Sequence, residues 1–369
     1  MRVPLPLVAL TLLVPLLAGC TSTSDDPLSK ADEALPFVVP EIPVLDGKAL
    51  VAHVSTFVEA YPKRNANGEA HKGARDYLEK SMQEAGLEVL RQPYEATPSR
   101  TSTPTNQVEQ DPHLENIMGI KWGRDRSSWI VIGGHYDVTD GAVYGAYDDG
   151  SGTIMTLEMA KAYAELDTLH TIAFMMFDGE EQGLTGSRHF VKMLTEGTFN
   201  ESLTGKADET VDYTPTIFAM INLDMFGINW PAEAPIYLDD NSDRVRAIVD
   251  DTRRAIEIPP EKFRYQGITL GRSDYAPFED RCIPIAFFIS SFEENYVGPA
   301  ALPAGVSYPF WHQADTVEGM ETMAGSRDLL EQGFTVAARL AGELLHKLAT
   351  TEGLDLEVRR QGLDCEADL

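Results

Sequence analysis

The chain has 369 residues, of which 43% are hydrophobic, so it can bury a complete core. Its 58 acidic residues outnumber 30 Lys and Arg, giving a formal net charge of −28. Nucleic-acid binding requires basic patches against phosphates, so this composition argues against a nucleic-acid partner. A surface of this charge can attract cations, among them metal ions and the amino termini of peptides.

Residues 1–19 are predicted to be a signal peptide. Arg2 supplies a positive start, residues 8–17 an apolar stretch, and Leu17-Ala18-Gly19-Cys20 a processing site. This tetrad resembles the bacterial lipoprotein box, in which the cysteine becomes the lipidated first residue; an ordinary secretory signal or an uncleaved anchor is the alternative. The resemblance implies lipidation at Cys20 and attachment to the bacterial cell envelope through acyl chains. Thr21, in place of a retention aspartate, favours the outer membrane.

Residues 20–46 contain Ser-Thr-Ser-Asp-Asp-Pro and further prolines, and are predicted to be a flexible tether. A globular domain is expected over 47–350 and a C-terminal tail over 351–369. No later stretch reaches the roughly 20 apolar residues that a membrane span needs. Besides Cys20, the chain contains Cys282 and Cys365. An extracytoplasmic location permits a disulfide between them, and two unpaired cysteines are the alternative.

Helices and strands are predicted to alternate through the globular region. In chain order they are helices 47–61 and 69–85, the second ended by Gly86, strand 128–133, helix 151–166, strands 171–177, 216–223 and 282–290, and helix 326–349. Residues 97–112 are expected to form a loop, and the acidic segments 196–213 and 231–243 surface insertions. This alternation predicts an α/β sheet covered on both faces.

Three of the predicted strands lead directly into polar residues. Strand 128–133 is followed by His135 and Asp137, strand 171–177 by Glu180 and Glu181, and strand 216–223 by Asp224. Ligands of open α/β sheets gather at the carboxyl ends of the strands, so we expect one edge to collect these side chains. Two loops, carrying Asp148 and His312, complete the set.

Two histidines and three carboxylates are chemically suited to two zinc ions: His135, Asp148, Glu181, Asp224 and His312. Imidazole nitrogen and carboxylate oxygen are zinc donors, and one bridging carboxylate would let five residues serve both ions. Glu180 and Glu181 are adjacent between Gly179 and Gly183, and side chains on successive extended residues diverge. One glutamate could therefore hold a metal while the other moves protons.

Six motifs occur in the order found in the secreted zinc aminopeptidases with a co-catalytic metal pair. They are Gly-Gly-His135-Tyr-Asp137, Asp148-Asp-Gly-Ser-Gly, Phe-Asp-Gly-Glu180-Glu181-Gln-Gly-Leu-Thr-Gly-Ser, Ile-Asn-Leu-Asp224-Met, Arg-Ser-Asp274 and His312-Gln-Ala-Asp315-Thr. Over residues 47–348 the chain resembles this family, which also includes aminopeptidase Y and the glutamate carboxypeptidases. The resemblance implies a three-layer α/β sandwich with a central, mostly parallel mixed sheet, the zinc-peptidase fold.

The resemblance also implies roles for single residues. His135 and Asp224 are expected on one zinc ion, Glu181 and His312 on a second, with Asp148 bridging. Glu180 matches the general base, and Asp137 would orient the His135 ring. The family's cis peptide is expected between Asp148 and Asp149. The implied activity is that of a metallo-aminopeptidase, with two zinc ions per chain, acting on peptides with a free N-terminus.

Departures from the family pattern leave alternatives. Tyr275 stands where many relatives carry histidine, and Tyr275 and Tyr308 are candidates for an oxyanion-stabilising tyrosine, with packing as the alternative role. Phe177-Asp-Gly-Glu-Glu and Gly186-Ser-Arg-His also resemble glutaminyl cyclases, single-zinc aminoacyltransferases of similar fold. The complete five-ligand set argues against a cyclase. The same set argues against a binding module, that is, a peptidase-like domain that has lost its metal ligands and its catalytic activity.

Overall fold

The computed structural model describes residues 36–66, 69–95, 113–205, 210–228, 236–265, 273–290 and 308–360. The predicted signal peptide, Cys20, loop 97–112 and Cys365 lie outside the described residues. Cys282 is disulfide-bonded. Within the described ranges, no helix combines the length and apolar character needed to cross a membrane.

Eight strands and nine α-helices make up the described part of the chain. The strands are β1 (Glu88–Glu95), β2 (His113–Lys121), β3 (Asp125–His135), β4 (His170–Phe177), β5 (Thr216–Leu223), β6 (Ile236–Asp240), β7 (Phe263–Tyr265) and β8 (Ile285–Ile289). The helices are α1 (Gly47–Ala60), α2 (Glu69–Glu84), α3 (Gly150–Tyr163), α4 (Thr185–Thr195), α5 (Asp243–Ala255), α6 (Ala276–Glu279), α7 (Val317–Ala324), α8 (Arg327–Thr350) and α9 (Leu354–Arg360).

The strands form one mixed sheet in the order β1-β2-β4-β3-β5-β8-β6-β7. The pairs β4/β3, β3/β5, β5/β8 and β6/β7 are parallel, whereas β1/β2, β2/β4 and β8/β6 are antiparallel. This confirms a central, mostly parallel mixed sheet. The parallel run β4-β3-β5 at its middle places three strand ends at one edge.

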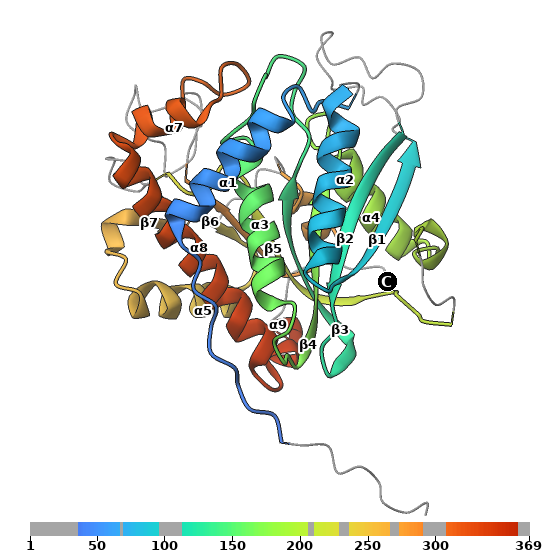
Figure 1. Ribbon diagram of the computed structural model, residues 1–369. Helices are drawn as coiled ribbons and strands as arrows, with labels where there is room; N and C mark the ends of the chain where they lie inside the picture. The colour runs from blue at the N-terminus through green and yellow to red at the C-terminus, as the bar shows by residue number, and fades with distance from the viewer. Residues whose placement is uncertain are drawn as a thin grey trace, which may run out of the picture. The chain divides into compact units, whose positions relative to one another are not determined.

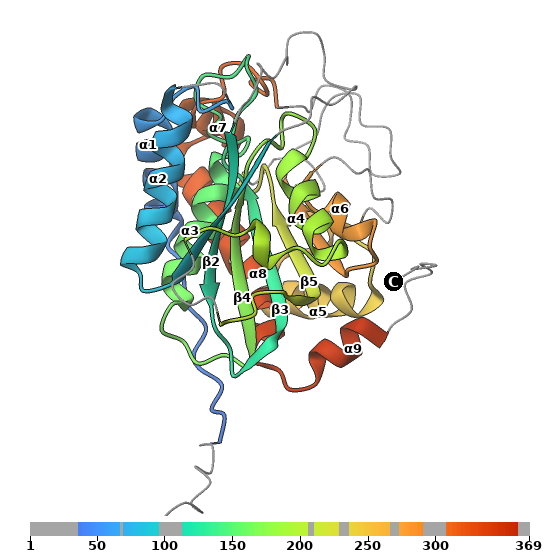
Figure 2. The same cartoon turned by 90° about the vertical axis from the view of Figure 1, so that its right-hand side faces the viewer.

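Successive side chains of the central strands are buried in two separate hydrophobic cores, one on each face of the sheet. In β3, Ile130 and Ile132 belong to one core, whereas Trp129 and Val131 belong to the other. A strand covered on both faces needs apolar residues at every position, which explains the continuous apolar runs read from the sequence. Figures 1 and 2 show the resulting layers, with α1, α2, α3 and α8 on one face and α4 and α6 on the other.

Most predicted elements are present with boundaries shifted by a few residues. Side chains that accept backbone N–H bonds begin several helices, such as Asp46 at α1, Ser242 at α5 and Ser326 at α8. Gly86, predicted to end the second helix, has a φ of 92° two residues after α2 ends.

The prediction of surface insertions was wrong in part. Segment 231–243 contains β6, every residue of which is buried and which pairs with β7 and β8. Segment 196–213 contributes the buried Phe199, Leu203 and Tyr213 to a core. The expected C-terminal tail includes α9, whose Leu354 and Val358 are buried in a core, where α9 contacts β5 and α5. These segments contribute to packing despite their acidic, turn-rich composition.

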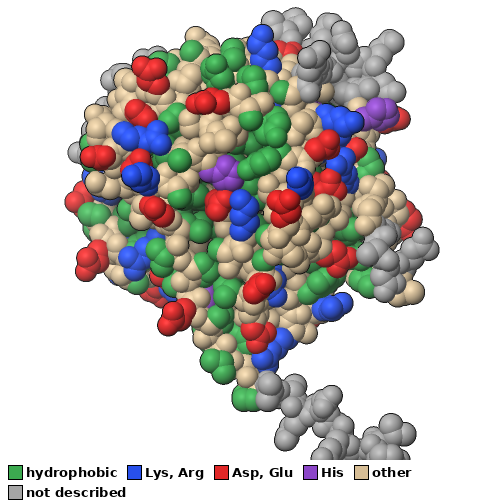
Figure 3. All heavy atoms as spheres, in the orientation of Figure 1, with side chains coloured by type: hydrophobic (Ala, Val, Ile, Leu, Met, Phe, Trp, Pro, Cys, Tyr) green, Lys and Arg blue, Asp and Glu red, His purple; other side chains and the backbone are tan. Residues whose placement is uncertain are grey.

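The charged side chains mix on the face formed by α1, α2 and α8. Figure 3 shows Asp and Glu beside Lys and Arg across this face, without a segregated patch of either sign. Ion pairs such as Lys80–Glu84 and Arg327–Glu331 account for part of this mixing. The chain's acidic excess is therefore not gathered here into a docking surface for a basic partner.

Candidate metal centre

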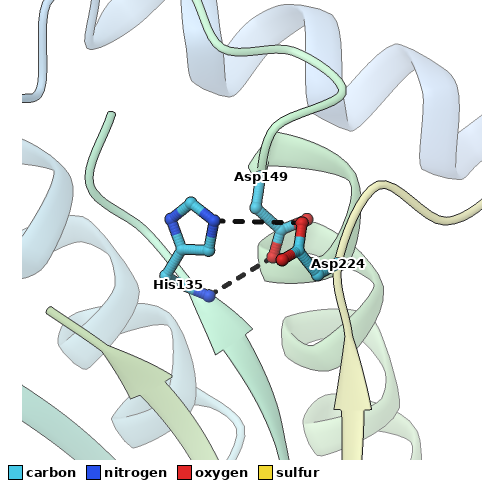
Figure 4. A group of neighbouring side chains, drawn as sticks. All are labelled: His135, Asp149 and Asp224. Carbon is cyan, nitrogen blue, oxygen red and sulfur yellow. Dashed lines mark hydrogen bonds and ion pairs between the residues drawn. The ribbon is translucent and has the colours of Figure 1, made fainter. Parts of the chain in front are cut away.

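The parallel strands β4, β3 and β5 bring the predicted ligands to one sheet edge. His135 is the last residue of β3, Glu180 and Glu181 follow β4, and Asp224 follows β5. Figure 4 shows His135 and Asp224 converging from their two strand ends, with the loop before α3 reaching between them. His312 approaches from the loop between β8 and α7.

Asp148 lies between the two histidines. Its Oδ1 is 3.2 Å from His135 Nε2, and its Oδ2 is 3.2 Å from His312 Nε2. On one side, His135 Nε2 lies 3.9 Å from Asp224 Oδ1; on the other, His312 Nε2 lies 3.3 Å from Glu181 Oε1. The structure thus brings all five predicted ligands together as two sets that share Asp148.

These distances fit a pair of zinc ions. Two donor atoms that each lie about 2.1 Å from one zinc ion are about 3.4 Å apart at the tetrahedral angle. Three of the four separations are close to this value. Asp224 Oδ1 is buried and, among the described residues, accepts no hydrogen bond, while Oδ2 accepts one from Ser273 Oγ at 2.8 Å. A buried carboxylate oxygen without a donor is expected where a cation binds.

The two sets differ in their access to solvent. The His135 side chain is 1% exposed, whereas that of His312 is 34% exposed. The ring of Trp311 stacks on His312 with centroids 3.6 Å apart. Among the described residues, the histidine of the Asp148, Glu181 and His312 set is therefore the more accessible of the two.

Crowded negative charge dominates the electrostatics of the centre. Burial raises the pKa of Asp224 to about 6, and burial together with Asp148 raises the pKa of Glu181. Burial lowers the pKa of His312, but Asp148 and Glu181 outweigh it and raise that pKa to about 10. Burial would likewise raise the pKa of Asp148, but His135 and His312 hold it below its ordinary value. A bound cation would relieve this crowding.

Glu180 lies beside the ligands, within electrostatic range of His135, Glu181 and Asp224. Burial, and then the neighbouring carboxylates, raise its pKa well above the ordinary value, against the attraction of His135. The fully buried Asp274 of the sequence motif adds to that rise. A carboxylate of raised pKa is suited to accepting a proton near neutral pH.

Asp137 connects the two strand ends. Its Oδ1 lies 3.4 Å from His135 Nδ1 and accepts the Glu180 N–H at 3.1 Å, while its Oδ2 accepts the Glu181 N–H at 3.3 Å. The His135 ring nitrogen also lies 3.2 Å from the Asp137 carbonyl oxygen. Asp137 is therefore placed to orient the imidazole and also to hold the turn of Glu180 and Glu181.

The peptide bond between Asp148 and Asp149 is cis, which confirms the prediction. Asp149 lies close to His135 and Asp224, but its carboxylate is occupied by amides. Oδ1 accepts from Gly152 N at 2.8 Å and Met225 N at 3.4 Å, and Oδ2 from His135 N at 3.3 Å. We therefore assign Asp149 to capping α3 and joining the ends of β3 and β5. Its place before the predicted helix was a capping signal in the sequence.

Both candidate oxyanion tyrosines have other partners. Tyr275 is buried, stacks on Phe287 and donates to Asp239 Oδ2 at 3.3 Å. Tyr308 donates to Asp315 Oδ1 at 2.5 Å. Asp315 Oδ2 in turn accepts the Asp148 N–H at 2.8 Å. Tyr308 therefore helps to hold the backbone of Asp148 in place through Asp315. The geometry thus supports a structural role for both, through packing for Tyr275 and through hydrogen bonding to Asp315 for Tyr308.

Two buried basic side chains behind the centre were not anticipated from the sequence. Arg64 is fully buried and donates to the carbonyl oxygens of Tyr136, Tyr144 and Gly145 in the loop between His135 and Asp148. The second is His71, which pairs with Asp178. No local pattern marks either residue, because their partners are backbone carbonyls and a distant carboxylate.

Comparison with known sequences identifies relatives. The profile of Peptidase family M28 matches residues 116–324, which include the five predicted ligands and Glu180. Aminopeptidase YwaD of Bacillus subtilis (strain 168) is 31% identical over 207 residues, 55% of this chain and 40% of YwaD. The chain thus spans less than half the length of this relative.

Comparison with solved structures shows the fold. A zinc aminopeptidase from Bacillus subtilis superposes with a TM-score of 0.64 at 19% identity, covering 85% of this chain and 97% of that one. A glutaminyl cyclase from an Acidobacteriales bacterium gives a TM-score of 0.60 at 17% identity, covering 89% and 99%. The zinc-peptidase fold inferred from the sequence is confirmed, and it is shared by both activities.

Proposed function

Because the chain belongs to peptidase family M28, we propose that it is a zinc-dependent aminopeptidase that hydrolyses the N-terminal peptide bond of peptides. The observation that carries the proposal is Asp148, whose two oxygens each lie 3.2 Å from a histidine of a different ligand set. A carboxylate shared between two histidine–carboxylate sets is suited to bridging two zinc ions.

The residues of the centre have three roles: holding metal, transferring a proton and positioning the proton acceptor. His135, Asp148 and Asp224 would hold one zinc ion, and Asp148, Glu181 and His312 the other. When bound, the metal pair supplies a Lewis acid for the substrate carbonyl and lowers the pKa of water. Glu180 accepts the proton of the attacking water and passes it to the departing amine. Asp137 keeps Glu180 in place through the Glu180 N–H, 3.1 Å from its Oδ1.

A glutaminyl cyclase is the alternative that shares this fold. That enzyme needs one zinc ion, whereas this chain keeps both histidines and all three carboxylates within one cluster. Zinc stoichiometry of the loaded protein separates the two: about two ions per chain favour the aminopeptidase, and one favours the cyclase.

The proposal is tested by Glu180→Gln. The variant keeps the ligands, so its zinc content should equal that of the wild type, while the rate at which it hydrolyses an unbiased peptide mixture should fall about 10²–10⁴-fold. Sequencing the products by mass spectrometry would show whether residues leave from the N-terminus. Near-normal turnover in the variant would refute the role of Glu180.

We also propose that the protein is a lipoprotein of the bacterial envelope, anchored through Cys20 at the outer membrane. The lipoprotein-box tetrad supports this proposal, and an extracytoplasmic site suits a disulfide at Cys282. Radiolabelled palmitate should label the wild type, and Cys20→Ser should abolish labelling. Labelling that persists in Cys20→Ser would exclude this anchor.

A further inference from the structure

A buried histidine from the helical layer contacts the base of the glutamate turn. His71, on α2, lies with Nε2 2.7 Å from Asp178 Oδ1, and the two side chains are 5% and 0% exposed. The imidazole also stacks on Tyr136 with ring centroids 5.2 Å apart. His71 precedes the segment that matches the family profile, so this contact is supplied from outside that segment.

Asp178 is the residue directly before Gly179, Glu180 and Glu181, and every polar group it has is used. Its N–H donates to Asn116 Oδ1 at 3.1 Å, and its carbonyl accepts from Tyr94 OH at 2.7 Å. Its Oδ2 accepts from Glu115 N at 2.8 Å and from Tyr136 OH at 2.7 Å. Oδ1 has His71 as its partner. Asp178 thereby anchors the start of the turn to β1, β2, α2 and the residue that follows β3.

The turn itself leaves little room for adjustment. Gly179 has a φ of 66°, and a Cβ there would lie 2.2 Å from Thr185 Oγ1. Further along, the Glu180 and Glu181 amides are held by Asp137. Removing His71 would leave one buried oxygen of Asp178 unpaired, at the end of the turn that Asp137 does not hold.

We propose that His71 is a positioning residue of the metal centre: through its pair with Asp178 it fixes the turn that presents Glu180 and Glu181. This inference rests on the proposed function for the roles of those two glutamates. The hydrogen-bonded pair acts on the turn, so its loss should affect both the glutamate ligand and the proton acceptor.

The charge state of the pair gives the inference a pH signature. Burial lowers the pKa of His71, but attraction and hydrogen bonding to Asp178 outweigh it, and the net shift is upward. Asp137 adds to the rise and Arg75 on α2 opposes it, while Tyr94 and Tyr136 contribute neutral hydroxyls at Asp178. A histidine with a raised folded pKa contributes its stabilisation at low pH and loses it as pH rises through that pKa.

The test compares His71→Ala and His71→Gln with the control His53→Ala. His53 on α1 makes a similar contact, Nδ1 to Glu158 Oε1 at 2.8 Å. The other hydrogen-bond partners of this pair in the described ranges are Tyr77 and Lys161, which lie outside the turn. Binding of Co²⁺, followed by its visible absorption, reports the centre without requiring turnover. We expect His71→Ala to weaken Co²⁺ binding and to lower kcat each by about 10–100-fold, with KM changed less than about twofold.

His71→Gln restores a donor toward Asp178 without the charge, so it should recover part of the loss. It should also remove the His71 contribution to the loss of stability as pH rises. If His71→Ala does not fold, His71→Gln carries the test. Co²⁺ affinity and kcat within about twofold of the wild type in His71→Ala, or equal losses in His53→Ala, would overturn the inference. A wild type without peptidase activity, whose Co²⁺ binding still weakens in His71→Ala, would reject the function and retain the role of His71.

Discussion

Arg64→Met should strongly destabilise the folded protein. Arg64 has no hydrogen bond to a carboxylate among the described residues; its guanidinium instead donates to three backbone carbonyls, including those of Tyr136 at 2.7 Å and Gly145 at 2.6 Å. Burial lowers its pKa to about 10, against the attraction of nearby aspartates, so the group stays charged at neutral pH. Methionine fills a similar volume and donates nothing.

The expected cost follows from the three acceptors left behind. An unsatisfied buried carbonyl costs about 1–3 kcal/mol. Because methionine is neutral, the variant avoids the desolvation penalty of burying the guanidinium, which offsets part of that loss. We therefore expect a loss of about 3–5 kcal/mol in the free energy of unfolding, a large share of the roughly 5–15 kcal/mol that stabilises a domain. Gly145 lies three residues before Asp148, so zinc affinity should fall as well.

Urea unfolding of the metal-free protein, followed by circular dichroism, measures this loss. The control is Arg339→Met, since Arg339 is 57% exposed and 4.0 Å from Glu343; its unfolding midpoint should stay unchanged. A cost below about 1 kcal/mol for Arg64→Met would show that the loop does not depend on the guanidinium.

Two further predictions concern the sheet. Burial raises the pKa of Asp239 to about 7, and its buried Oδ1 has no hydrogen-bond partner in the described part of the chain. The folded pKa lies above the unfolded value of about 3.9, so wild-type stability should fall between about pH 4 and 7. Asp239→Asn should therefore exceed the wild type by about 2–4 kcal/mol at pH 8 but not at pH 4 in urea titrations; a difference independent of pH would contradict this assignment. In Gly134→Ala, the new Cβ would lie 2.3 Å from Asp149 Oδ2 and 2.4 Å from the Leu223 carbonyl. Thermal unfolding should show a loss of about 1–3 kcal/mol, whereas Gly342→Ala, with open space around it, should show none.

Much of the fold could be predicted because its signals are local. Residues 171–177 and 216–223 are apolar runs ending in polar residues, and the structure places β4 and β5 there within one or two residues. Strand β6 was missed because a five-residue strand with two aspartates resembles an acidic turn. Asp240 is accommodated by Arg246, 3.0 Å away, and such a partner is visible only in the folded chain.

By itself, the sequence determined the ligand types and which edge of the sheet would collect them, since parallel neighbouring strands end on the same side. It also indicated the division of five ligands into two sets, through the family resemblance. The resemblance also selected Asp148 over the adjacent Asp149, but only the tertiary structure showed the reason: Asp149 accepts backbone amides while Asp148 faces both histidines. The tertiary structure alone revealed Arg64 and His71, whose partners come from strand ends and turns far along the chain.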